Sequence, residues 1–473
     1  MKKHLLFLLL MMLPLAVSAT PQIIDGIYYN LNSATQTAEV TSHTSRKYSG
    51  DIIIPSSVTY EGIEYSVTSI GDNAFMNCFS LTSVNLPNGV KHIGKSAFAF
   101  CLRLTSINFP DVMETIEQEA FWNCRGLKAI DIPDNLTKIG ISAFGYCNGL
   151  TSIDIPSSVS NMGNYAFESC ENLTSVTISA NLQTIGEGVF MGCRSLESIS
   201  IPNSVIAIGE NAFASCWALS SITLPNRLMI IGDYAFYYCM SLTSVTIPES
   251  VQSIGFRAFN LCPALTTIKV EGGNPMFDSR EDCNAIIYTT DNVLLVGCQN
   301  TVIPNGVESI GSYAFWGNEG LTSIIIPDGM ASINEYAFYN CTNVATVVIP
   351  NSVTKIEEGA FENIHFKNVY VYAEQVPEAT RRLFGENCPQ KATLHVPATA
   401  VETYKNARYW NEFGSIVALT ENDPNPTGIK SVSNSVKAIE RYYTIDGKLL
   451  SAPQRGLNII KMSDGKTRKV VIK

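Results

Sequence analysis

Phenylalanine recurs every 23 residues through most of this 473-residue chain. Nine phenylalanines keep this interval without a break, and three more resume it after a gap. Their positions are Phe75, Phe98, Phe121, Phe144, Phe167, Phe190, Phe213, Phe236 and Phe259, then Phe315, Phe338 and Phe361. A fixed period of 20 to 50 residues indicates a solenoid, because one coil cannot bury its apolar face alone and must stack on its neighbours. The sequence therefore predicts an elongated α/β repeat solenoid.

Each coil repeats one template of small and apolar residues. In one coil it consists of Val90, Ile93-Gly94, Ala97-Phe98, Cys101, Leu104, Ile107 and Phe109-Pro110. Residues 104–109 alternate apolar and polar side chains, which predicts a short strand, and residues 90–93 predict a second one. Apolar spacings of three to five between Ile93 and Leu104 predict a short helical turn. Three coils carry Glu or Asn at the position of Gly94, so a positive φ is not required there.

The cysteines follow the same interval. Nine of the 13 are Cys78, Cys101, Cys124, Cys147, Cys170, Cys193, Cys216, Cys239 and Cys262. Equivalent side chains in stacked coils project in parallel about 4.8 Å apart, whereas a disulfide needs Cβ atoms about 3.5–4.5 Å apart. We therefore expect a row of buried free thiols. Disulfide pairing and a metal site are the alternatives, although parallel thiols do not converge on one ion.

The interval breaks between Phe259 and Phe315, where 33 extra residues enter near 271–303. Residues 285–288 and 293–296 are apolar and flank a polar four-residue segment, which predicts a β-hairpin. Folding about the centre of that loop places Cys283 directly opposite Cys298, within disulfide range. A bridge between these two cysteines is a hypothesis from this register.

The two ends of the chain differ in charge and composition from the repeats. Residues 1–19 are typical of a secretory signal with cleavage near Ala19, and their apolar run is too short to span a membrane. The net charge of −10 argues against nucleic-acid binding, which needs a basic stripe. Residues 429–473 are basic, with ten Lys or Arg and three Asp or Glu. We expect export and no transmembrane span in the mature chain.

No motif of a known catalytic chemistry is present. The sequence has no HExxH zinc motif, no GxSxG nucleophile elbow and no phosphate-binding glycine loop. The histidines outside the signal-like segment lie in four unrelated contexts. The prediction is therefore no catalytic residue, no cofactor and no metal.

Large amphipathic side chains occupy loop positions next to the repeated Phe and Cys, where other coils carry Gly, Ser or Asn. The candidate partner-binding residues are Trp122, Tyr146, Trp217, Tyr237, Tyr238, Met240 and Trp316. Trp, Tyr and Met are enriched as anchors in protein interfaces. Trp217 lies one coil before residues 237–240, so we expect contact between them. The alternative is that these side chains only cover the edge of the core.

The string IP-x-x-V-x-x-IG-x-x-AF-x-x-C-x-x-L resembles the BspA-like leucine-rich repeats of surface proteins from Bacteroidetes-type bacteria and some oral spirochaetes, over residues 49–363. Residues 392–420 resemble the closing segment of such proteins, on Leu394-His395-Val396-Pro397, Tyr404 and Trp410-Asn411-Glu412-Phe413. Residues 429–473, with Tyr443-Thr444-Ile445-Asp446-Gly447-Lys448, are similar to the C-terminal sorting domain of type IX secretion. A small basic β module that caps or tethers is the alternative for this tail.

The resemblance implies a secreted, surface-displayed adhesin that binds host matrix proteins such as fibronectin and fibrinogen, or other bacteria. It supplies no set of ligand-contact residues. An extracellular or periplasmic carbohydrate-capture module is the alternative function, since aromatic side chains also stack on sugars. The expected organisation is a signal at 1–19, an N-terminal cap at 20–48, the solenoid at 49–363, a C-terminal cap at 364–420, a linker at 421–428 and a small β tail at 429–473.

Overall fold

The computed structural model describes residues 20–42, 47–179, 181–385 and 389–425, together with four strands between 439 and 472. The chain divides into two compact units. The first comprises Met1–Val302 with Gly311–Gly320, and the second Ile303–Ile310 with Leu321–Lys473. The predicted signal at 1–19 lies outside the described residues, as do residues 426–428 of the predicted linker.

The first unit begins with antiparallel strands that extend the sheet of the coils. Strands β1 (Gln22–Ile24), β2 (Ile27–Asn32) and β3 (Thr37–Thr41) pair antiparallel in this order. Strand β6 (Ile63–Ile70) pairs in parallel with β3 and antiparallel with β5 (Ser57–Tyr60). Beyond β6 every neighbour in this sheet is parallel, so the pairing changes where the repeats begin.

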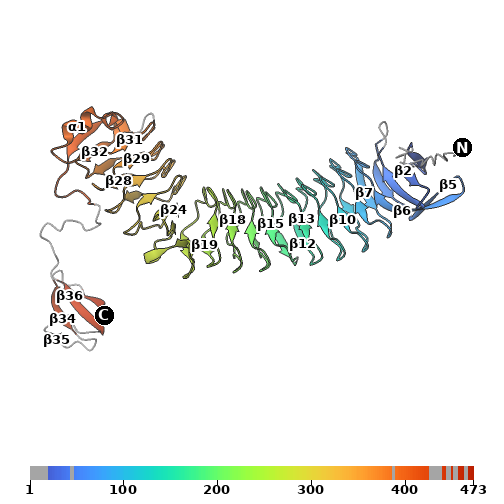
Figure 1. Cartoon of the computed structure of the whole chain (residues 1–473), viewed down its shortest axis with the longest axis horizontal. Coiled ribbons are helices and arrows are strands. Elements are labelled where there is room, and N and C mark those ends of the chain that lie inside the picture. The colour runs from blue at the N-terminus through green and yellow to red at the C-terminus, as the bar shows by residue number, and fades with distance from the viewer. Residues whose placement is uncertain are drawn as a thin grey trace, which may run out of the picture. The chain divides into compact units, whose positions relative to one another are not determined.

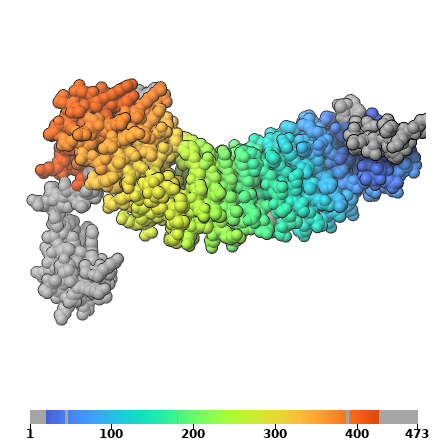
Figure 2. All heavy atoms as spheres, in the orientation of Figure 1, coloured from blue at the N-terminus to red at the C-terminus, as the bar shows by residue number. Residues whose placement is uncertain are grey.

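Each coil of the first unit contributes to one or both of two rows of short parallel strands (Figure 1). One row contains β8 (His92–Ile93), β10 (Thr115–Ile116), β11 (Lys138–Ile139) and β13 (Asn161–Met162), then β15 (Thr184–Ile185), β17 (Ala207–Ile208), β18 (Ile230–Ile231) and β20 (Ser253–Ile254). The other contains β4 (Gly50–Ile53), β7 (Leu81–Asn85), β9 (Ser106–Ile107), β12 (Ser152–Ile155), β14 (Ser175–Ile178), β16 (Ser198–Ile199), β19 (Ser244–Ile247) and β21 (Thr267–Val270). The coils stack side by side in Figure 2, from blue to yellow. The register joins equivalent residues, for example Ser152 with Ser175, so the 23-residue period sets the stacking.

The prediction of a short helical turn in each coil is wrong, because the segment that carries Ala-Phe consists of tight turns. In residues 72–77, alternate N–H groups bond to carbonyls three residues back. The N–H groups of Asn73, Phe75 and Asn77 instead donate to carbonyls of the next coil, at 2.7–2.9 Å. Asn73 and Asn77 have positive φ, 58° and 61°, and the equivalent residues of the other coils of this unit repeat both values closely. An α-helix would bond these N–H groups within its own segment and lose the bonds between coils.

The glycine that begins most of the turns serves close packing. Gly94 has no positive φ, which confirms the expectation from its replacements in other coils. A Cβ atom at Gly94 would lie 2.6 Å from the backbone nitrogen of Asp72 in the preceding coil. Such a distance is too short for a real contact, so glycine lets the turns of adjacent coils approach.

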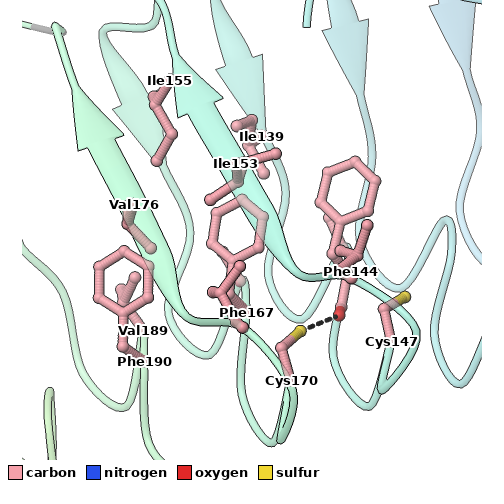
Figure 3. Packing of buried hydrophobic residues seen from close by; sticks show 14 of the residues in the cluster. Ile139, Phe144, Cys147, Ile153, Ile155, Phe167, Cys170, Val176, Val189 and Phe190 are labelled. Atoms are coloured by element: carbon pink, nitrogen blue, oxygen red, sulfur yellow. Dashed lines mark hydrogen bonds between the residues drawn. The ribbon is translucent and has the colours of Figure 1, made fainter. Parts of the chain in front are cut away.

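The repeated phenylalanines form a continuous buried stack in the first unit. From Phe75 to Phe259 the centroids of neighbouring rings lie 4.9–5.8 Å apart, with planes within 17° of parallel. The rings of Phe144, Phe167 and Phe190 are seen in a row on successive coils in Figure 3. Offset parallel stacking at such distances is favourable, and burying each ring contributes roughly 1.5–3 kcal/mol. The stack is a main source of cohesion between coils.

The cysteines form a second row beside the phenylalanines. The twelve cysteines in the described residues are free thiols, as expected for the row from Cys78 to Cys262. The thiol of Cys170 donates to the carbonyl oxygen of Phe144 in the preceding coil at 3.2 Å (Figure 3). Equivalent bonds recur from Cys101 to Cys262 at 3.1–3.3 Å. Each thiol therefore links two coils without a covalent bond.

The 33-residue interruption contains the predicted hairpin. Strands β23 (Ala285–Tyr288) and β24 (Val293–Gly297) are antiparallel, with the loop at 289–292. Strand β22 (Phe277–Asp278) pairs antiparallel with β23. A short 3-10 segment, η1 (Arg280–Asp282), connects β22 to the hairpin.

The structure does not bring Cys283 and Cys298 together in a bridge. A β-bulge between Ile286 and Ile287 shifts the register, so that Ala285 pairs with Gly297. The thiol of Cys298 consequently contacts the carbonyl of Asn284, at 3.4 Å. Both cysteines are buried free thiols. The prediction assumed one register along the whole hairpin, and the bulge changes that register before the strands reach the two cysteines.

The second unit contains further coils of the same kind. One row of parallel strands contains β25 (Ser309–Ile310), β27 (Ser332–Ile333), β29 (Lys355–Ile356) and β31 (Glu378–Ala379). The other contains β26 (Ser323–Ile325), β28 (Thr346–Ile349), β30 (Asn368–Val371), β32 (Thr393–Val396) and β33 (Ser415–Ala418). The ring of Phe361 stacks on Phe338 at 5.5 Å and on Phe384 at 6.2 Å, so the aromatic stack also runs through this unit.

A short helix and two 3-10 turns close the last coil of the second unit. These are η2 (Pro389–Lys391), α1 (Val401–Asn406) and η3 (Trp410–Glu412). The buried indole of Trp410 packs edge-on against Tyr404 and Phe384, both at 5.4 Å. Its Nε1–H donates to the carbonyl of Pro377 at 3.3 Å. The apolar end of the stack is thereby covered.

The tail forms a separate antiparallel sheet in the order β35-β34-β36-β37. Its strands are β34 (Ile439–Tyr443), β35 (Leu449–Leu450), β36 (Gly456–Met462) and β37 (Thr467–Ile472). This agrees with the predicted small β tail. In the described residues, no helix has the length and apolarity needed to cross a membrane.

Candidate functional site: an aromatic and arginine surface on the coil turns

The tight turns place the candidate binding residues on the outside of the coils. In most turns, Ala and Phe point into the core, whereas at least one residue beside this pair or beside the following Cys remains partly exposed. Backbone bonds between adjacent turns hold these side chains in columns, one residue per coil. Contacts between neighbouring coils therefore depend on which residues occupy the same column or nearby columns.

The first candidates form a small pair. The rings of Trp122 and Tyr146 meet edge-on with centroids 4.7 Å apart. The hydroxyl of Tyr146 donates to Glu168 at 3.3 Å, and burial raises the pKa of the Glu168 carboxyl. In the part of the chain that the structure describes, no ring contact joins this pair to the remaining candidates.

The other candidates gather around three turns of the first unit. Trp217 contacts Tyr238, as expected, with centroids 6.1 Å apart at 88°. Tyr237 lies between Tyr238 at 6.2 Å and Trp316 at 6.5 Å. Met240 is 40% exposed on the same turn. The structure therefore brings five of the seven candidates to one region.

Two arginines belong to this region and were missed from the sequence. The guanidinium carbon of Arg194 lies 4.4 Å from the ring centroid of Trp217. That of Arg257 lies 3.4 Å from the centroid of Trp316 and 4.3 Å from that of Tyr313. Such cation–π contacts are attractive, by about 0.5–1 kcal/mol when exposed and more when desolvated. One face of each indole is thus covered by a cation.

Two further aromatic rings complete the surroundings of Arg257. The ring centroids of Phe256 and Tyr234 lie 5.4 and 5.7 Å from its guanidinium carbon. Burial raises the pKa of Tyr237, while the charge of Arg257 acts in the opposite direction. We call the whole set the aromatic–arginine surface. It comprises Arg194, Trp217, Tyr234, Tyr237, Tyr238, Met240, Phe256, Arg257, Tyr313 and Trp316.

A signal for the missed residues exists in the repeat itself. Tyr234 and Arg257 are 23 residues apart, and Tyr313 is one further coil on once the 33 inserted residues are removed. The three therefore share one column. The candidates predicted from the sequence lie beside the repeated Phe and Cys, and this column precedes those positions. Arg194 does follow Cys193, in the column of Trp217, but only large amphipathic side chains were selected there.

Two buried donors of the surface have no acceptor within the described residues. They are Nε1–H of Trp217 and Nε–H of Arg257. An unpaired buried donor costs about 1–3 kcal/mol.

The described residues contain no arrangement that suggests bound metal. Within them, no group of three or more His, Cys, Asp or Glu side chains could hold an ion. A cavity of about 20 Å³ beside Phe259, Phe315 and Trp316 has room for roughly one water. A larger cavity of about 680 Å³ lies beside Arg381, Arg382 and Arg408, next to η3.

Comparison with known proteins identifies the repeats. A sequence profile described as the BspA type leucine rich repeat region matches residues 55–174, 161–280 and 296–412. No protein with a curated description matches the chain.

Several solved structures are similar to the chain. A leucine-rich repeat protein from Bacteroides ovatus is 28% identical, with a TM-score of 0.62, and the match covers 84% of this chain and 100% of that protein. A leucine rich cell surface protein from Faecalibacterium prausnitzii is 23% identical over 85% of this chain and 96% of its own, with a TM-score of 0.44. A leucine-rich repeat protein from T. pallidum is 30% identical over 41% of this chain and 87% of its own, with a TM-score of 0.37.

The matched segments cover well over half of the residues, and the stacked coils have the 23-residue period of the sequence template. Repeats of this family are generally non-catalytic binding scaffolds. The chain belongs to the BspA-type leucine-rich repeat proteins.

Proposed function

We propose that the protein is exported, displayed at the cell surface and used as an adhesin-like protein that binds another protein through the aromatic–arginine surface. The observation that carries this proposal is the clustering of Trp, Tyr and Arg on adjacent turns. These three residue types dominate the binding energy of protein interfaces. The BspA-type repeats and the signal-like residues 1–19 support it. Host matrix proteins or proteins of other bacterial surfaces are the expected partners.

The arrangement favours a protein partner over the carbohydrate alternative. A sugar stacks on an open aromatic face, but Arg194 lies over the ring of Trp217 and Arg257 over that of Trp316. What remains accessible includes apolar side chains, with Phe256 45% and Met240 40% exposed. Such a mixture of apolar and cationic groups is typical of protein interfaces.

The proposed surface is tested by replacing Trp217 with alanine in the chain from residue 20 to 473. We expect binding to immobilised fibronectin or fibrinogen to weaken about 30-fold, because truncating an interface anchor typically costs about 2 kcal/mol or more. Surface plasmon resonance measures the dissociation constant.

Trp122→Ala is the matched control, since Trp122 is also a half-buried indole on a coil turn but lies outside the surface. Equal losses in both variants would contradict the proposed surface. Signal on a glycan array, with no binding to either matrix protein, would favour the carbohydrate function.

The tail is proposed to direct display through the type IX route. A chain truncated after residue 428 is then expected to be retained inside the cell envelope, whereas the full chain reaches the exterior. Cell fractionation with immunoblotting measures both. Normal display of the truncated chain would leave the tail as a capping or tethering module.

A further inference from the structure

The guanidinium of Arg257 contacts aromatic rings but forms no ion pair with a carboxylate of the described residues. Its guanidinium carbon lies 3.4 Å from the ring centroid of Trp316, 4.3 Å from that of Tyr313 and 5.7 Å from that of Tyr234. Its Nε–H is buried without an acceptor, and no carboxylate of the described residues forms an ion pair with it. Aromatic faces attract the charge but offer no hydrogen-bond acceptor in the guanidinium plane.

Arg194 provides a comparison within the same surface. It also stacks on an indole, that of Trp217, at 4.4 Å. Glu171, in the same column one coil earlier, pairs with Arg194 at 3.3 Å. The column of Arg257 instead has Tyr234 one coil earlier and Tyr313 one coil later. The repeat thus supplies an acid for one stacked arginine and aromatic rings for the other.

The acid beside Tyr234 in the adjacent turn is already engaged. Asp233, next to Tyr234 in the preceding coil, accepts the backbone N–H of Phe256 at 2.7 Å. This bond fixes the turn that carries Arg257, so Asp233 cannot rotate to the guanidinium without giving it up. Asp233 is therefore held away from the role of a partner acid, which leaves the guanidinium of Arg257 to an acceptor from another molecule.

We propose that Arg257 binds a carboxylate of an acidic segment of the partner protein. A planar guanidinium forms two parallel hydrogen bonds to one carboxylate, and a surrounding of aromatic rings strengthens them by excluding water. Phe256, 45% exposed beside Arg257, would contact an apolar neighbour of the acid. This combination favours an acidic peptide over a sugar acid. The inference rests on the proposed function of the same surface.

The test uses two fluorescein-labelled octapeptides, one of alternating Glu and Leu and one with Gln in place of each Glu. Fluorescence anisotropy measures their affinities for the chain from residue 20 to 473. We expect the acidic peptide to bind at least tenfold more tightly than the Gln peptide. Arg257→Gln is expected to remove this difference, while Arg257→Lys retains part of it, because an ammonium keeps the charge but not the planar pair of donors.

Arg194→Gln is the matched control, since that arginine already has Glu171. It is expected to leave the preference for the acidic peptide unchanged. Circular dichroism melts show whether each variant is folded. A further measurement needs no substitution. The affinity of the unaltered chain for the acidic peptide should fall as the pH drops below about 4, because the Glu carboxylates of the peptide become protonated.

Equal affinity for the two peptides would overturn the inference, as would equal effects of the two arginine substitutions. So would binding of hyaluronan that depends on Arg257 in the absence of peptide binding. The outcomes separate this inference from the proposed function. If Trp217→Ala abolishes binding to the matrix protein but Arg257→Gln does not, the surface stands and the carboxylate contact fails.

Discussion

Replacing Phe167 with alanine is expected to lower the free energy of unfolding by about 3–5 kcal/mol. The ring of Phe167 is fully buried and lies between those of Phe144 at 5.4 Å and Phe190 at 5.8 Å. Its own backbone N–H donates to Val189 in the next coil at 3.0 Å. Because such bonds fix the spacing of the coils, the neighbours cannot close the cavity, and its full cost remains.

Urea denaturation followed by circular dichroism measures this loss. Phe79→Ala is the control, because Phe79 is 52% exposed and belongs to no stack. Its removal should change stability by less than about 0.5 kcal/mol. Similar losses for Phe79 and Phe167 would show that the aromatic stack does not hold the coils together.

The stack and the thiol row could be predicted because both follow directly from the period. Once the coils stack in register, every residue of the template meets its equivalent, and small and apolar residues at fixed positions must face inward. The hairpin near Tyr288 could be predicted for a similar reason, since its strands and loop are contiguous in sequence. Such elements can be predicted because the residues that determine them are contiguous or repeat at a fixed interval.

The turn around Phe75 could not be predicted from the same local pattern. Its apolar spacing fits a helix, but the carbonyls of the next coil compete for alternate N–H groups, and no property of a single coil reveals this competition. The bulge at Ile286 likewise depends on how the hairpin fits its neighbours. The turn does leave one local signal, because asparagine, which tolerates a positive φ well, occupies positions 73 and 77.

The arginines of the binding surface were missed for a different reason. Arg257 is an ordinary polar residue within its own coil, and only alignment of the columns across the inserted residues places it between Tyr234 and Tyr313. The aromatic residues could be found because bulky side chains are unusual at loop positions. The solenoid fold can therefore be predicted from the repeat alone. A binding surface on it can be found only by comparing equivalent positions of successive coils.

Raising the pH above 9 is expected to unfold the first unit cooperatively. Burial holds the pKa of Cys124, Cys147, Cys170, Cys193, Cys216 and Cys239 well above the ordinary value of 9.0. The folded chain thus keeps these thiols protonated, while the unfolded chain loses the protons as the pH passes 9. Their contribution to stability is complete below pH 9 and falls as the pH rises, by about 1 kcal/mol per thiol for each unit.

Six such thiols together remove on the order of 5–10 kcal/mol within about one pH unit, which matches the whole stability of a typical domain. Urea denaturation in a reducing buffer between pH 7 and 10.5 measures this slope. Exchanging Cys147, Cys170 and Cys193 for alanine removes three titrating groups. The number of protons released on unfolding, which the slope of the free energy of unfolding against pH reports, should then decrease by about three, whatever stability the substitutions cost at pH 7. An unchanged slope would mean that tyrosine or lysine ionisation, and not the thiol row, governs alkaline unfolding. The row would then act only through its packing and its hydrogen bonds to the phenylalanine carbonyls.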